Sequence, residues 1–190
     1  ELAQFIVGEG FLQPYGKCKL QVYTVDNYNH SDTYAPPVPP SPNLPNLRSI
    51  ILYPSLCYFE ATEVSVGRGT DHPFQLYGHP DFQLNDHFIP KPKPGASNPK
   101  HRGILCKGQK LNKEDLPKVL GHKMIRWNFL WDAYDRLGNQ LVDRARFMNL
   151  LMGTDSWNEY LDLDISEWKA SYESELQVFK EKRRKYLLYP

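Results

Sequence analysis

Apolar residues recur at helical spacing in two stretches near the end of the chain. Between Asn128 and Leu137 they form a one-sided stripe that Gly138 closes, which predicts an amphipathic helix. A second stripe follows Asp164, a suitable N-cap residue, with members three and four positions apart: Ile165, Trp168, Tyr172, Leu176 and Phe179. This pattern predicts a long C-terminal helix. The basic run 180–185 then lies at the negative end of the helix dipole, so we expect a solvated helix face rather than a nucleic-acid patch.

Shorter elements are predicted in the rest of the chain. Residues 1–12 and 113–120 indicate short helices, the second stopped by Gly121. Residues 18–25 alternate between apolar and polar, which predicts a strand with one buried face. Further extended pieces are expected at residues 64–65, 74–77, 82–90 and 104–106. Together the elements predict an α+β fold, with a small mixed β-sheet, flanking helices and a long C-terminal helix.

Two neighbouring segments in the first third are harder to assign. Six of the ten residues 36–45 are proline, which predicts extended backbone at the surface. This segment is either a linker or a stiff wall that presents Ser41 and Asn43, and we favour the wall because a strongly apolar segment follows. That segment, residues 47–60, is compatible with a helix or a buried strand, and Pro54 suggests a break or a helix start.

Composition narrows the class of protein. The 190 residues are 41% hydrophobic and 24% charged, with a net charge of +1, so no global charge directs the protein to nucleic acid or to an anionic membrane. No run is long enough to span a bilayer. Three cysteines and six histidines show no metal-ligand spacing, and no cofactor is predicted. The first methionine is Met124, so we expect a processed protein or an excised segment.

The richest candidate chemistry lies in residues 60–74, directly after the apolar segment. Gly67 and Gly69 flank Arg68, which lets the backbone take positive φ angles while the guanidinium stays free to bind an anion. The competing interpretation is a tight turn that carries a solvated charge.

Several short phrases, in order and spacing, resemble one protein family. They are Glu-Leu-Ala at 1–3, Pro-Ser-Pro-Asn-Leu-Pro at 40–45, Tyr-Pro-Ser-Leu-Cys at 53–57, Ser-Val-Gly-Arg-Gly-Thr at 65–70, Pro-Phe at 73–74, Phe-Ile-Pro at 88–90, Cys-Lys-Gly at 106–108, Leu-Met-Gly at 151–153 and Tyr-Leu-Leu-Tyr at 186–189. Together they resemble the C-terminal half of the NamZ-like exo-β-N-acetylmuramidases, over nearly the whole chain.

The resemblance implies part of a glycoside hydrolase that releases terminal N-acetylmuramic acid from the non-reducing end of peptidoglycan fragments. It implies that residues 1–190 form a single C-terminal domain, whose partner is a Rossmann-like N-terminal half of the same protein, with the active-site cleft between the two. A periplasmic or secreted location would follow. A non-catalytic module that binds cell-wall sugar or assembles with another subunit is the alternative.

The resemblance also suggests roles for individual residues. Glu60 is the candidate catalytic carboxylate, because it ends an apolar element where burial would raise its pKa. Its alternative role is to pin the neighbouring loop. Arg68 would bind the lactyl carboxylate of the sugar, unless it pairs internally with Glu60 or Glu63. The remaining substrate-binding candidates are polar residues whose alternative role is to form turns or loops: Asn43, Ser41, Glu63, Ser65 and Thr70.

Two departures from the family pattern and one cysteine pair complete the expectations. Ala61 replaces a usual glycine, which could crowd the turn, and His-Pro-Asp at 79–81 replaces an expected Ala-Pro-Trp, which could alter a sugar-stacking wall. If the protein is exported, Cys57 and Cys106 could form a disulfide and leave Cys18 free.

Overall fold

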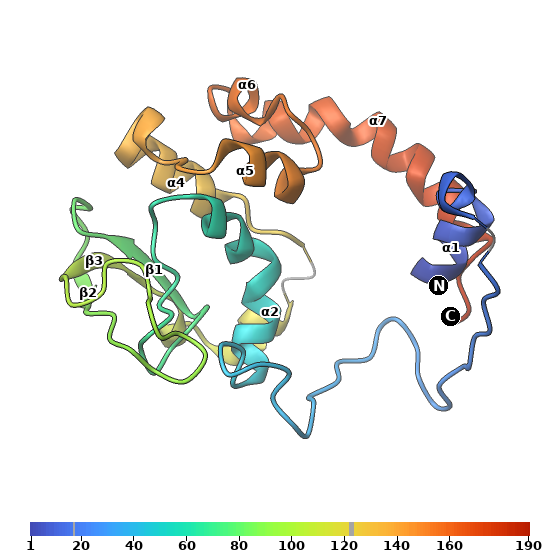
Figure 1. Ribbon diagram of the computed structural model, residues 1–190, viewed down its shortest axis with the longest axis horizontal. Coiled ribbons are helices and arrows are strands. Elements are labelled where there is room, and N and C mark those ends of the chain that lie inside the picture. The colour runs from blue at the N-terminus through green and yellow to red at the C-terminus, as the bar shows by residue number, and fades with distance from the viewer. Residues whose placement is uncertain (17, 122–123) are drawn as a thin grey trace. The chain divides into compact units, whose positions relative to one another are not determined.

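The computed structural model describes residues 1–16, 18–121 and 124–190, which form two compact units. Unit 1 combines the two ends of the chain, Glu1–Tyr34 and Ser166–Pro190, and unit 2 comprises Ala35–Ile165 (Figure 1). Over the described residues the fold is α+β, with seven α-helices and one three-stranded sheet. No helix in this part of the chain is long and apolar enough to cross a membrane.

The apolar segment 47–60 is helical. Helix α2 (Leu47–Leu56) begins with a capping box, in which the Asn46 side chain accepts from the Ser49 amide and Ser49 accepts in return from the Asn46 amide. Pro54 lies inside the helix, which neither breaks nor starts there and ends two residues later. The helix tolerates this proline because burial of Leu52 and Leu56 offsets the missing hydrogen bond.

The sheet of unit 2 is antiparallel throughout rather than mixed. Its strands are β1 (Leu76–His79), β2 (Asp86–Phe88) and β3 (Cys106–Lys110), in the order β1-β3-β2. Gly78 faces Gly108 in the register between β1 and β3. Residues 64–65, which were expected to form an extended piece, contribute one isolated β-bridge, between Ser65 and Gly78. Both pairings, β1 with β3 and β2 with β3, are antiparallel, and no helix crosses between the strands within the described residues 76–110.

The remaining helices of unit 2 follow the sheet. Helix α4 (Asn128–Leu137) has the predicted bounds. Helix α3 (Leu116–Gly121) overlaps the helix predicted at 113–120, but begins three residues later and includes Gly121, which was expected to stop it. Helices α5 (Ala145–Met152) and α6 (Trp157–Leu161) were not predicted. Four 3-10 helices complete the regular structure of the described residues: Gln13–Tyr15, Cys57–Ala61, Leu111–Lys113 and Gly138–Gln140.

An aromatic stack connects the 3-10 helix Cys57–Ala61, the sheet and α4. The ring of Phe59 stacks on Tyr77 of β1 with centroids 5.3 Å apart, and Tyr77 contacts Phe129 of α4 at 5.4 Å. Phe59 and Tyr77 are 1% exposed and Phe129 is fully buried. Because Phe59 immediately precedes Glu60, this core fixes the backbone from which the Glu60 side chain leaves.

Unit 1 brings the two ends of the chain together. Helix α1 (Leu2–Gly8) confirms the first predicted helix, and its Phe5 packs edge-to-face on Phe179 of α7 and on Tyr186. Helix α7 (Ile165–Arg184) confirms the long C-terminal helix. Within the basic run, Lys185 forms an ion pair with Glu9 at 2.8 Å.

Two further predictions are wrong. Residues 18–25 form no strand and are exposed throughout, because the described part of unit 1 offers no strand to pair with. All three cysteines are free thiols, so the expected Cys57–Cys106 disulfide is absent. The Cys57 Sγ faces the Pro54 carbonyl, whereas Cys106 is buried against Leu76 and Phe88 of the sheet.

Candidate functional site

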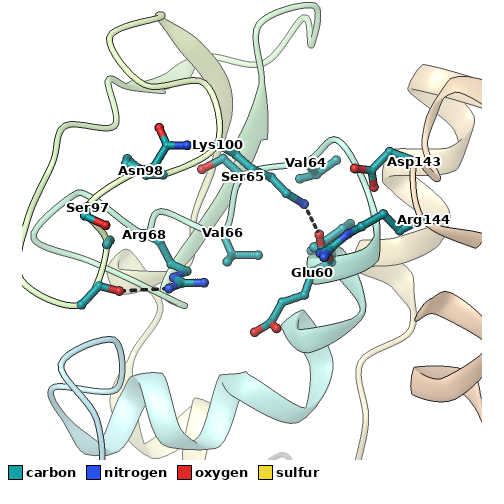
Figure 2. Close-up of a pocket in the computed structure, with 14 residues that line it drawn as sticks. Glu60, Val64, Ser65, Val66, Arg68, Ser97, Asn98, Lys100, Asp143 and Arg144 are labelled. Carbon is teal, nitrogen blue, oxygen red and sulfur yellow. Dashed lines mark hydrogen bonds between the residues drawn. The ribbon is translucent and has the colours of Figure 1, made fainter. Parts of the chain in front are cut away.

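Glu60 lies on the 3-10 helix Cys57–Ala61, which continues α2 and is called the Glu60 turn below. Its half-buried side chain lines a pocket of about 410 Å³ (Figure 2). Seven other polar or charged residues line the same pocket: Ser65, Arg68, Ser97, Asn98, Lys100, Asp143 and Arg144. Figure 2 shows the Glu60 carboxylate and the Arg68 guanidinium extending into one opening. The pocket therefore joins two acids, Glu60 and Asp143, with several cations and neutral hydrogen-bonding groups.

The glycines around Arg68 take the backbone conformation that the sequence predicts. Gly67 has φ +76° and Gly69 has φ +84°. A Cβ at Gly69 would lie 2.5 Å from the Lys91 carbonyl oxygen, so only glycine allows the two loops to approach this closely. This tight packing holds the exposed Arg68 at the rim of the pocket.

Arg68 contacts the backbone rather than a carboxylate. Its Nη2 donates to the Gly95 carbonyl at 2.9 Å. Over the described residues it forms no ion pair with Glu60 or Glu63, so the internal salt bridge considered from sequence is not what the structure contains. One edge of the guanidinium therefore donates a hydrogen bond to the protein, and the rest of the side chain remains accessible to solvent.

Ser65 and Thr70 brace the loop that carries Arg68. The buried Ser65 hydroxyl accepts from the Gly67 amide at 3.3 Å, and the Thr70 hydroxyl donates to the Gly67 carbonyl at 2.7 Å. Ser65 also lines the Glu60 pocket, whereas Thr70 lines a neighbouring pocket of about 250 Å³. Their hydroxyls thus shape the loop from both ends.

The second half of the proline-rich segment is docked, as the wall interpretation requires. Asn43 donates from Nδ2 to the Gly95 carbonyl at 2.8 Å and lines the smaller pocket. The Ser41 hydroxyl accepts from the Asn43 amide at 3.2 Å and so shapes a turn. Ser41 lines neither pocket.

Glu63 lies just beyond the Glu60 turn and lines neither of these pockets. Its amide donates to the Leu141 carbonyl at 2.9 Å, and its carbonyl is 2.6 Å from Nε2 of His101. The structure therefore groups Glu60, Ser65 and Arg68 in one pocket, and Asn43 and Thr70 in its neighbour.

The two departures from the family pattern fall at separate places. Ala61 is fully buried and does not have a positive φ, so the turn accommodates its methyl group. His79 ends β1, with its ring centroid 4.8 Å from that of His101 and its pKa lowered chiefly by burial. Neither His79 nor Asp81 lines the two pockets.

Sequence reasoning missed Lys100 and Arg144. The Lys100 Nζ donates to the carbonyl oxygens of Phe59, at 2.8 Å, and of Thr62, and burial lowers the pKa of its ammonium to about 8. The Arg144 Nη2 donates to the Glu60 carbonyl oxygen. Lys100 stands in a basic, proline-rich stretch without periodicity, so no sequence pattern distinguishes it from its solvated neighbours. The part of the chain that the structure describes contains no group of His, Cys, Asp and Glu arranged to hold a metal ion.

Comparisons with known proteins agree on one family. Residues 51–189 match the family model described as exo-β-N-acetylmuramidase NamZ, C-terminal. The peptidoglycan β-N-acetylmuramidase NamZ of Bacillus subtilis (strain 168) is 32% identical over 184 residues, which cover 83% of this chain and 42% of that protein.

Two crystal structures of DUF1343 family proteins from Bacteroides fragilis NCTC 9343 are similar to the structure of this chain. One is 40% identical with a TM-score of 0.90, covering 99% of this chain and 54% of the other. The second has a TM-score of 0.72 at 17% identity, covering 100% of this chain and 55% of the other, and shows likeness of fold alone. The chain spans about half the length of these relatives.

Proposed function

The chain belongs to the family of C-terminal domains of the exo-β-N-acetylmuramidase NamZ, and we propose that it forms one wall of a muramidase active site. The intact protein would release terminal N-acetylmuramic acid from the non-reducing end of peptidoglycan fragments. The observation that carries this proposal is that Glu60 and Arg68 line the same pocket. The chain that holds this pocket belongs to the NamZ family. The other wall would come from an N-terminal half of the same protein, with a Rossmann-like fold.

Glu60 is the proposed catalytic carboxylate. Glycoside hydrolases commonly use two carboxyl groups, one that protonates the leaving oxygen and one that acts as nucleophile or activates water. Glu60 is half-buried at the end of a rigid turn and extends into the pocket, as either role requires (Figure 2). The second carboxyl group would come from the N-terminal half, so we expect the 190-residue chain alone to be inactive.

Arg68 is the proposed binding residue for the negative charge of the substrate. N-acetylmuramic acid carries a lactyl carboxylate, which a guanidinium binds through two parallel hydrogen bonds. Because Arg68 has no carboxylate partner in the described residues, its charge is available to a ligand. Asn43 and Ser41, with Ser65, Thr70 and Glu63, would supply further polar contacts to the sugar or hold the loops that supply them.

The location follows from the substrate. Peptidoglycan lies outside the cytoplasmic membrane, so an enzyme that acts on its fragments would meet them there first. We therefore propose a periplasmic or secreted protein with a role in recycling the cell wall.

The decisive experiment uses the intact protein with a chromogenic N-acetylmuramic acid glycoside. We expect release of the chromophore, and at least a hundredfold lower kcat for Glu60→Gln. Glu159→Gln is the matched control, because Glu159 is exposed on α6 and lines neither pocket. Saturable sugar binding without hydrolysis would identify a binding module instead, and would end the enzymatic proposal.

A further inference from the structure

The Glu60 turn ends in a row of carbonyl groups. That of Phe59 already accepts from the Thr62 amide at 3.2 Å and from the Thr62 hydroxyl at 3.0 Å, and the row receives further donors from distant segments. The last carbonyls of a helix have no partner within the helix, and they carry the negative end of its dipole. Here that end lies beside the Glu60 carboxylate, so two sources of negative potential share one turn. A turn of this kind needs positive donors to hold a single conformation.

Two residues supply donors to four consecutive carbonyls. Lys100 Nζ binds the Phe59 carbonyl oxygen at 2.8 Å and also that of Thr62. Arg144 binds the two oxygens between them: its Nη2 donates to that of Glu60, and its backbone amide to that of Ala61 at 3.3 Å. Figure 2 shows the Lys100 and Arg144 side chains approaching the turn from different segments of the chain.

Lys100 is well suited to this task and poorly suited to direct sugar binding. Two of its donors already face backbone oxygens, and its stem is half-buried. The charged groups that act on its ammonium are Asp143, Arg144, Glu63 and Glu60. Its positive charge therefore opposes the combined negative potential of Glu60 and the carbonyl row.

We infer that Lys100 and Arg144 are positioning residues, which clamp the carbonyls of residues 59–62 and thereby fix the direction of the Glu60 side chain. The clamp itself follows from the contacts in unit 2. Only its consequence for catalysis rests on the proposed function.

Amide hydrogen exchange of the intact protein tests the clamp without any assumption about activity. In Lys100→Met we expect exchange in residues 57–64 to be about tenfold faster, with exchange in α4 unchanged. Lys91→Met is the matched control. The Lys91 side chain is exposed, and the hydrogen bond that Lys91 makes to the Gly69 carbonyl comes from its backbone amide, which the change to Met keeps. Unchanged exchange in residues 57–64, or equal acceleration in α4, would overturn the inference.

Arg144→Met applies the same test if Lys100→Met does not fold. This variant removes the bond to the Glu60 oxygen and keeps the backbone bond to Ala61, so we expect the same local signature with a smaller amplitude. If exchange is the same as in wild type, the clamp is refuted.

Kinetics of the intact protein then separate positioning from binding. Each clamp variant should lower kcat about tenfold and leave KM nearly unchanged. In a Glu60→Gln background the same change should have no further effect on kcat, because the clamp acts through Glu60. A loss confined to KM would refute positioning. If the intact protein cleaves no muramic acid glycoside, the proposed function fails while the exchange result still decides the clamp.

Discussion

Asn43 and Arg68 donate to the same oxygen, the carbonyl of Gly95. The distances are 2.8 Å from Nδ2 of Asn43 and 2.9 Å from Nη2 of Arg68. The two phrases that most specifically carry the family resemblance, Pro-Ser-Pro-Asn and Ser-Val-Gly-Arg-Gly-Thr, therefore meet at one point of a third loop. This shared oxygen ties the Asn43 turn and the Arg68 guanidinium to the same loop.

The first prediction concerns Arg68 and the substrate's charge. Charge-assisted hydrogen bonds contribute about 1.5–3 kcal/mol, equivalent to about tenfold or more in binding. In the intact protein we expect kcat/KM on a muramic acid substrate to fall in Arg68→Lys, which keeps the charge but loses the fork, and further in Arg68→Ala. Because Arg68 is exposed and holds only a carbonyl, the melting temperature should change little.

A parallel measurement on an N-acetylglucosamine glycoside gives the control, since that sugar lacks the lactyl group. Equal losses on both sugars would show that Arg68 does not read the carboxylate. A stable Arg68→Ala protein with unchanged kcat/KM would end the hypothesis.

The second prediction concerns Asn43. Asn43→Ala removes one hydrogen bond to Gly95, worth about 0.5–1.5 kcal/mol, so Tm should fall by about 1–5 °C. We expect KM to rise as well, because Arg68 then shares its acceptor with water. Asn158→Ala, at an exposed position on α6, should change neither quantity. An unchanged KM in Asn43→Ala would show that the shared oxygen does not orient Arg68.

The sequence predicted well those elements whose pattern depends only on neighbouring residues. The stripe of α4 and its closing Gly138 define a helix whose bounds match residue for residue, because amphipathic periodicity and a glycine stop are both local. Residues 18–25 show an equally clear alternation and yet form no strand. A strand needs a hydrogen-bonding neighbour, and periodicity alone cannot reveal whether one exists.

The candidate site divides in the same way. Glu60 and Arg68 were found from short phrases and do line one pocket. Lys100 and Arg144 were missed because their partners are backbone carbonyls 38–84 residues away in sequence. Any residue can offer a carbonyl, so a contact of this kind leaves no trace in the pattern of side chains.

The third prediction concerns the thiols. Titration under denaturing, non-reducing conditions should count three free thiols, and a count of one would restore the disulfide between Cys57 and Cys106. In the folded protein Cys18 should react first with a thiol reagent, because it is exposed. Burial raises the pKa of Cys57 to about 11 and that of Cys106 to about 12, so both should react slowly at neutral pH.

The fourth prediction follows from the pKa of Lys100, lowered to about 8 by burial. An unfolded lysine has a pKa of about 10.4, so between about pH 8 and 10.4 the unfolded chain binds more protons than the folded one. The stability of wild type relative to Lys100→Met should therefore rise with pH in this window. Both carbonyl contacts can survive, since a neutral amine keeps two N–H donors.

Urea unfolding of the two proteins at about pH 7 and pH 9.5 measures the change. Taking the difference cancels the other titrating groups, because both proteins contain them. A difference that stays constant or falls between these two pH values would contradict the lowered pKa.

The last prediction compares two glycines with similar backbones and different surroundings. Gly69 has φ +84° and Gly103 has φ +76°, so alanine costs about 1–2 kcal/mol of backbone strain at either position. A Cβ at Gly103 meets open space, whereas one at Gly69 would lie 2.5 Å from the Lys91 oxygen and 2.7 Å from Pro99 Cγ. Gly69→Ala must therefore also push apart the loops on either side of Arg68. We expect its free energy of unfolding to fall further than that of Gly103→Ala by about 1 kcal/mol or more, and kcat/KM to fall in Gly69→Ala alone. Equal effects of the two changes on unfolding and on kcat/KM would mean that the close approach at Gly69 does not position Arg68.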